Sequence, residues 1–126
     1  KSPLTLPMQH PADLTVLSEK CLLMTYGIRN RGLMGIGVRI SIDGGTTWRP
    51  PWVIHQFGPE AKDIGYPSTV LLDKKGNLLT AFYTDYEPSL KKKPNRYRVL
   101  AKKWSFKDWL HPSIIESISD GKQLKI

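Results

Sequence analysis

Apolar and polar residues alternate along much of this chain with a period of two, which is typical of β-strands that are buried on one face only. The clearest case is the run in which Val38, Ile40 and Ile42 are separated by polar residues. Short apolar runs fall at residues 14–17, 21–26, 35–43 and 52–54. Turn-forming residues separate these runs, and no stretch of useful length has the period of 3.6 that a helix requires. The pattern therefore predicts four short antiparallel strands in the first half of the chain.

The second half of the chain repeats this pattern. When Pro67 is placed on Pro11, apolar positions of two hairpins coincide at an offset of 56 residues. Further strands are predicted at residues 67–72, 78–83, 97–104 and 114–118. Four-stranded modules with a repeat of this length are typical of β-propeller blades. We therefore expect an all-β fold of two four-stranded antiparallel blades, at residues 10–57 and 65–122, in one partial propeller domain over residues 1–126.

A tight corner is predicted in the octapeptide 41–48, which reads Ser-x-Asp-x-Gly-x-x-Trp. Its two glycines reach positive φ at no steric cost, and Asp43 can accept hydrogen bonds from backbone N–H groups downstream. Trp48 then returns a large apolar side chain beside the strand that has just ended. Ser41, Asp43, Gly45 and Trp48 are therefore predicted to be structural residues of a hairpin corner.

The octapeptide resembles the Asp-box of the sialidase-type, or BNR-repeat, β-propellers; an ordinary Asp-Gly-Gly hairpin is the alternative. Residues 10–14, 23–29 and 63–68 are similar in order and spacing to the C-terminal blades of that family, over most of residues 10–104. Residues 105–109 keep the serine, aspartate and tryptophan of the box without its glycines, as a degenerate copy or a chance cluster. The resemblance implies a propeller of about six blades, of which this chain would hold two. It also implies that the Asp-box lies at the blade periphery, away from the active site.

Sialidases hydrolyse terminal sialic acids from glycans, and the resemblance implies a similar site here. The family holds the sugar carboxylate with three arginines, because a planar guanidinium donates two parallel hydrogen bonds. Its nucleophile is a tyrosine paired with a glutamate, since a neutral phenol is not repelled by an anionic sugar. Tyr66 has the position of this nucleophile, although Pro67 stands where many sialidases have serine, and a packed tyrosine is the alternative. Arg29 and Arg31 both lie in the zone of one carboxylate-binding arginine, and Arg29 matches the pattern better.

Two further residues stand just ahead of the first strand of each module. The resemblance implies that His10 and Asp63 contact sugar hydroxyls, and positions on a surface loop are the alternative. Arg39 alternates with apolar strand residues, which favours a structural role. The remaining arginines, the glutamate and the acid aspartate of the family would come from blades outside this chain. Two blades alone are therefore expected to be inactive.

Composition narrows the class of partner. A chain of 126 residues that is 40% hydrophobic can bury a core, and no apolar run approaches the roughly 18 residues of a membrane span. Lysine and arginine number 19 against 11 acidic residues, a formal net charge of +8, which favours anionic partners. Because no nucleic-acid motif accompanies this charge, an acidic sugar is preferred to a nucleic acid as the partner.

Cys21 is the single cysteine, so no internal disulfide is possible. The sequence has neither the spacing of metal ligands nor a cofactor motif.

These observations lead to two functional hypotheses. The first is that the chain is the C-terminal portion of a sialidase-like glycoside hydrolase that acts on terminal sialic acid or a related acidic sugar. The second is a non-catalytic β-propeller module that binds or scaffolds and has kept only the Asp-box fold. The expected partners are a glycan and the remaining propeller blades, supplied by a longer chain or, in the minor alternative, by assembly of three copies. The family resemblance favours a secreted or periplasmic protein.

Overall fold

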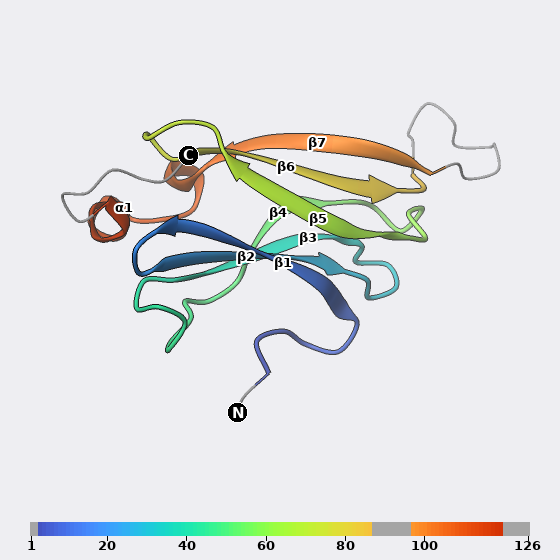
Figure 1. The fold of residues 1–126 in the computed structure, drawn as a ribbon. Helices are drawn as coiled ribbons and strands as arrows, with labels where there is room; N and C mark the ends of the chain where they lie inside the picture. The colour runs from blue at the N-terminus through green and yellow to red at the C-terminus, as the bar shows by residue number, and fades with distance from the viewer. Residues whose placement is uncertain (1–2, 87–96, 120–126) are drawn as a thin grey trace.

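The structure is a computed structural model that describes residues 3–86 and 97–119. Two antiparallel sheets make up most of this part of the chain (Figure 1). The first sheet has the order β1 (Gln9–Ser18), β2 (Cys21–Ile28), β3 (Gly35–Ser41) and β4 (Trp52–Gln56). The second has the order β5 (Ile64–Leu71), β6 (Asn77–Thr84) and β7 (Arg98–Ser105), followed by the 3₁₀ turn η2 (Phe106–Asp108) and the helix α1 (Pro112–Ser119). The all-β prediction is confirmed.

The two sheets are stacked, and their first strands β1 and β5 lie side by side (Figure 1). The hydroxyl of Thr15 donates to the carbonyl of Thr69 at 3.2 Å, and the N–H of Thr69 donates to Oδ2 of Asp13 at 3.3 Å. At the other side of the stack, the rings of Trp52 in β4 and Trp104 in β7 are 6.1 Å apart. The two sheets are therefore stacked with their strands in the same order. The first strands, β1 and β5, lie together on one side, and the last strands, β4 and β7, lie together on the other.

The main core lies between the sheets, because alternate residues of each strand point into the gap. Its most deeply buried members are Leu17, Leu23, Ile36, Val38, Ile40, Ile64, Leu78 and Phe106. Burial of each such side chain contributes about 1.5–3 kcal/mol, so this layer is the principal source of stability. A short chain of hydrogen-bonded side chains crosses the core. Its polar groups are paired with one another, as is usual for buried polar groups. In it, the Trp104 indole donates to Thr80 at 2.8 Å, and the Thr80 and Thr69 hydroxyls are 2.8 Å apart.

The predicted fourth strand of the second module was wrong, because residues 114–118 belong to helix α1. The second sheet has three strands in the described residues, so the expectation of two four-stranded blades is corrected for this module. Pro112 starts the helix, where its fixed φ is favourable and its missing N–H costs nothing. Ile118 then faces the core with 1% exposure, and its carbonyl accepts a hydrogen bond from Ser18 at 3.0 Å. The apolar run at residues 114–118 is too short for its periodicity to distinguish a strand from a helix.

The serine–aspartate–tryptophan cluster at residues 105–109 forms a helix cap. The Ser105 hydroxyl accepts from the N–H of Lys107 at 3.2 Å, and the Asp108 carboxylate accepts from the N–H of Ser105 at 3.1 Å. This reciprocal arrangement is a capping box. Trp109 stacks on Trp52 with ring centroids 5.8 Å apart. Without glycines the segment makes a 3₁₀ turn instead of the tight reversal of an Asp-box.

The octapeptide 41–48 forms a hydrogen-bonded corner at the end of β3, which we call the Asp-box corner after the motif that its sequence resembles. Oδ1 of Asp43 accepts from the hydroxyl of Ser41 at 2.8 Å and from the N–H of Thr47 at 2.9 Å. The Ser41 hydroxyl accepts from the N–H of Gly45 at 2.8 Å, and Gly45 has a φ of 95° that favours glycine. The Trp48 indole closes the corner by donating to the carbonyl of Gly45 at 3.2 Å.

This corner gives a testable pH dependence. Hydrogen bonds from the side chain and backbone of Thr47, and from Ser41, lower the pKa of Asp43 to about 2. Because this value lies below that of the unfolded chain, the carboxylate stabilises the fold above about pH 4 and loses this effect as the pH falls towards 2. We expect the unfolding free energy of the wild type to fall more steeply across that window than that of Asp43→Asn, measured by urea denaturation. Parallel profiles would show that the carboxylate does not hold the corner.

Arg39 has a structural role on the outer face of the first sheet. Its guanidinium donates to three carbonyls, those of Leu4 and Arg49 at 2.8 Å and that of Trp48 at 3.0 Å. The carbonyls come from the N-terminal segment and from the end of the Asp-box corner. Arg39 therefore ties these two segments together, as expected from its place among apolar strand residues.

Candidate functional site

One edge of the sheet stack gathers most of the candidate residues. At this edge the strands β2 and β6 end and the strands β5 and β7 begin. These ends lie together because neighbouring strands of an antiparallel sheet run in opposite directions. We call this the strand-end edge and define it by residues 29–34, residues 57–63, Asp85 and Tyr97. The Asp-box corner follows the opposite end of β3, so it lies at the other edge.

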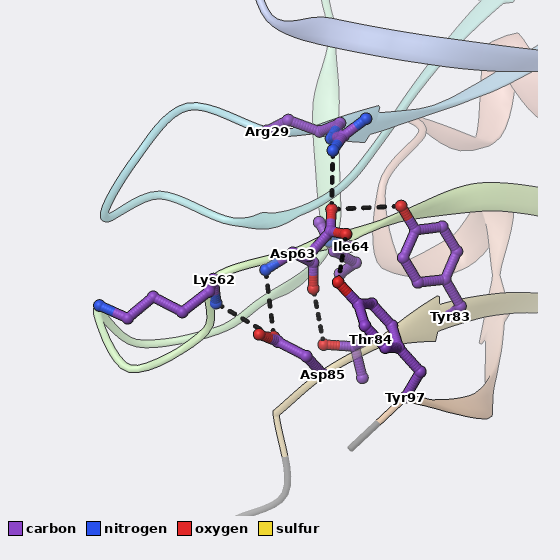
Figure 2. A network of polar contacts seen from close by, with 8 residues as sticks. All are labelled: Arg29, Lys62, Asp63, Ile64, Tyr83, Thr84, Asp85 and Tyr97. Atoms are coloured by element: carbon purple, nitrogen blue, oxygen red, sulfur yellow. Dashed lines mark hydrogen bonds and ion pairs between the residues drawn. The ribbon is translucent and has the colours of Figure 1, made fainter. Parts of the chain in front are cut away.

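Asp63 is the centre of a polar network at this edge (Figure 2). Its Oδ1 accepts from Nη2 of Arg29 at 2.8 Å and from the hydroxyl of Tyr83 at 3.1 Å. Its Oδ2 accepts from the hydroxyl of Tyr97 at 2.9 Å. Arg29 follows the first sheet, whereas both tyrosines come from the second. The ion pair therefore joins the two sheets and fixes the direction of the Arg29 guanidinium.

The backbone around Asp63 is fixed as well (Figure 2). Oδ1 of the buried Asp85 accepts from the N–H groups of Lys62 and Asp63, both at 3.1 Å. The hydroxyl of Thr84 donates to the carbonyl of Asp63 at 3.1 Å. Hydrogen bonds to a charged acceptor are stronger than neutral ones. Asp85 therefore holds the backbone of both Lys62 and Asp63.

Tyr66 lies beside this network with an unusual backbone. Its side chain is 72% exposed, and its ring centroid is 5.6 Å from that of Tyr83, which is in turn 5.6 Å from that of Tyr97. Its φ of 48° is rare for a bulky residue, and Pro67 makes it less favourable still. Such backbone strain is concentrated at functional sites in proteins. In the described ranges, 3–86 and 97–119, its hydroxyl has no hydrogen-bond partner.

The two phenols bound to Asp63 are kept neutral. The hydrogen bond to Asp63 is the main cause that raises the pKa of Tyr97. Burial is the main cause that raises the pKa of Tyr83, and the charge of Asp63 adds to it. A phenol with the ordinary pKa of about 10 is already neutral at neutral pH, and a raised pKa keeps both phenols as hydrogen-bond donors to a higher pH. Neither is activated as a nucleophile in this arrangement.

The structure brings together Arg29, Asp63 and Tyr66 through the ring of Tyr83. Arg31 stands apart from this network, exposed at the tip of the turn that follows β2. The imidazole of His10 is exposed at the start of β1 and makes no hydrogen bond within the described part of the chain. Of the two arginines that the sequence left as alternatives, Arg29 is the one held by an acidic partner.

Four side chains of the network were missed by the sequence analysis: those of Tyr83, Thr84, Asp85 and Tyr97. Tyr83 and Thr84 end β6, and Asp85 follows it. Because β6 pairs with the strand that starts directly after Asp63, the register of this hairpin was a usable signal. Tyr97 stands immediately before β7 and carries no local signal. Its contact with Asp63 spans 34 residues of sequence, and only the fold brings the two together.

The described residues contain no group of three or more histidine, cysteine, aspartate or glutamate side chains that could hold a metal ion. No helix in that part of the chain is both long and apolar enough to cross a membrane. Neither the comparison with protein-family models nor the comparison with curated proteins finds a match for this chain.

Proposed function

We propose that this chain forms two adjacent blades of a sialidase-like propeller and that its strand-end edge binds a carboxylate-bearing sugar. The parallel stacking of the two sheets, first strand on first strand, supports the blade arrangement. Both outer faces of the stack also carry exposed apolar side chains, at Leu14 and Val16 on one side and at Val70 and Val99 on the other. Apolar faces of this kind are normally covered, and further blades would cover them.

The observation that carries the binding proposal is the ion pair between Arg29 and Asp63, beside the neighbouring rings of Tyr66 and Tyr83. A guanidinium has five N–H donors, and Asp63 takes one hydrogen bond from Nη2. Because Nε of Arg29 is buried, the donors that remain for a ligand are those of Nη1 and the second N–H of Nη2, and this pair suits a planar carboxylate. Asp63 holds the cation in place before any ligand arrives, which reduces the entropy that binding costs. The exposed Tyr66 ring then lies next to the bound sugar.

In the catalytic form of this proposal, Tyr66 is the nucleophile. Its phenol is neutral and therefore compatible with an anionic sugar, but it requires a carboxylate base to take its proton. Asp63 is engaged by Tyr83 and Tyr97, so that base comes from a further blade of the propeller. The hydrolytic activity is thus proposed for the complete propeller, while binding is proposed for the edge described here.

The binding proposal is tested with Arg29→Ala. We expect saturable binding of N-acetylneuraminic acid to weaken about tenfold or more, because a charged hydrogen-bond donor to the carboxylate is lost. Isothermal titration calorimetry measures the change. The matched control is Arg49→Ala, which removes the same charge beside the Asp-box corner and should leave the affinity unchanged. Equal affinity in the wild type and Arg29→Ala would contradict the proposal.

A non-catalytic binding module is the second candidate. The observation that favours it is that the carboxylate of Asp63 is hydrogen-bonded to Tyr83 and Tyr97 instead of Tyr66. This arrangement orients donors towards a ligand but does not activate a nucleophile. An intact protein that binds N-acetylneuraminic acid through Arg29 and releases no product from a fluorogenic sialoside would establish this second function.

A further inference from the structure

Two surface hollows at the strand-end edge share the cations Arg31 and Lys62, whose side chains lie outside the Asp63 network. One, of about 380 Å³, is lined by Met8, Arg29, Asn30, Arg31, Met34 and Lys62. The other, of about 300 Å³, is lined by Arg31, Met34, Pro59, Ala61 and Lys62. Because they share Arg31, Met34 and Lys62, we treat them as one feature and call it the Arg31–Lys62 hollow.

The local structure explains why both cations are presented there. Arg31 is at the tip of a turn in which the N–H of Leu33 donates to the carbonyl of Asn30 at 2.9 Å. Gly32 supplies the positive φ, 81°, that such a turn requires at its third position. Lys62 is held from the other side, because its N–H is bound by Asp85. Two segments whose backbones are held by hydrogen bonds therefore bring two cations to one hollow.

The charge of the hollow is not compensated within the described part of the chain. The charge of Arg29 is balanced by Asp63 at 2.8 Å. The side chains of Arg31 and Lys62 make no hydrogen bond or ion pair among residues 3–86 and 97–119. Two uncompensated cations at a concave surface focus a positive potential that attracts anions.

We propose that the Arg31–Lys62 hollow binds a tetrahedral oxyanion, namely a sulfate or phosphate ester group carried by a sugar. A planar carboxylate has two oxygens and is satisfied by the fork of one arginine. An ester of sulfate or phosphate presents three terminal oxygens in different directions, so it can contact Arg31 and Lys62 at the same time. The hollow adjoins the proposed carboxylate site, because Arg29 lines one part of it, whereas the side chains of Arg31 and Lys62 make no hydrogen bond or ion pair with the carboxylate of Asp63.

The test measures binding of galactose 6-sulfate, unsubstituted galactose, inorganic sulfate and inorganic phosphate by calorimetry at low salt. The variants are Arg31→Ala, Lys62→Ala and the double substitution. Lys20→Ala is the control, because it removes one positive charge from the β1–β2 turn at the opposite edge. Thermal unfolding of each variant checks that the fold is retained, as expected for exposed side chains.

We expect galactose 6-sulfate to bind and galactose not to bind. Each single substitution should raise the Kd about three- to tenfold, and the double substitution should abolish binding, because charge-assisted hydrogen bonds are lost. Binding of the inorganic ions alone, with the same sensitivity to the variants, would support the hollow and assign it to a free anion. Binding that is insensitive to both substitutions, or equally weakened by Lys20→Ala, would overturn the proposal.

Discussion

Replacing Tyr66 by phenylalanine is expected to lower the turnover of a fluorogenic sialoside by the intact protein roughly a thousandfold or more. The substitution removes the attacking oxygen and keeps the ring, whose centroid is 5.6 Å from that of Tyr83. Sugar binding should therefore persist, so the loss should appear in kcat and hardly in KM. The side chain is exposed, and the hydroxyl makes no hydrogen bond in the described residues, so the fold should be unaffected.

The matched control for Tyr66→Phe is Tyr86→Phe, which removes a hydroxyl from a half-buried ring packed on Phe57. Turnover by this control should match that of the wild type. Full turnover by Tyr66→Phe would remove Tyr66 from the catalytic machinery. Absence of turnover in the wild type, together with retained binding, would leave the edge as a binding site only.

The second large effect is expected for Asp63→Asn, which keeps the shape of the side chain and removes its charge. Arg29 loses its counter-ion and two phenols lose a charged acceptor, so the unfolding free energy should fall by about 2 kcal/mol. The pKa of Tyr97 should return towards the ordinary value of about 10, because the hydrogen bond to Asp63 is the main cause of its rise. The pKa of Tyr83 should fall only in part, since burial is the main cause there.

Tyrosinate absorbance against pH measures both titrations, and urea denaturation measures the free energy. In the wild type the folded-state pKa values of these phenols lie above the unfolded value. Their contribution to stability is therefore complete below about pH 10 and is lost as the pH rises through the folded-state values. The control is Asp73→Asn at the opposite edge, where Asp73 accepts from the N–H of Lys75 at 2.8 Å. It should lower stability without moving the tyrosine titrations, and unchanged titrations in Asp63→Asn would contradict the network.

Much of the fold was predictable because local pattern decides it. The alternation of Val38 and Ile40 with polar residues placed β3, and the Asp-Gly-Gly sequence after it placed a corner. The residues at 114–118 were assigned to a strand because five residues of mixed apolar character do not show a period. Pro112 was the overlooked signal, since proline favours the first turn of a helix.

The candidate site was predictable only in pieces. The contact between Arg29 and Asp63 could not be predicted from the sequence, because 34 residues separate them. Arg29 follows the second strand of the first sheet, and Asp63 precedes the first strand of the second sheet. The positions of the network's tyrosines depend on strand register. The register decides on which face of the sheet, and near which end of the strands, each side chain lies. Arg29 and Arg31 are two positions apart in the chain and line the same hollow, yet only Arg29 pairs with Asp63, because Arg31 lies at the tip of the turn that contains Gly32.

The central claim is that an anionic sugar binds at the strand-end edge and not elsewhere on the sheet stack. The most direct measurement is a titration of the ¹⁵N-labelled protein with N-acetylneuraminic acid, followed by two-dimensional NMR of the backbone amides. We predict saturable shifts at Arg29, Asp63, Tyr66 and Tyr83, with the amides of the Asp-box corner at residues 43–48 unmoved. Shifts confined to that corner, or no saturable shift at any amide, would contradict the account.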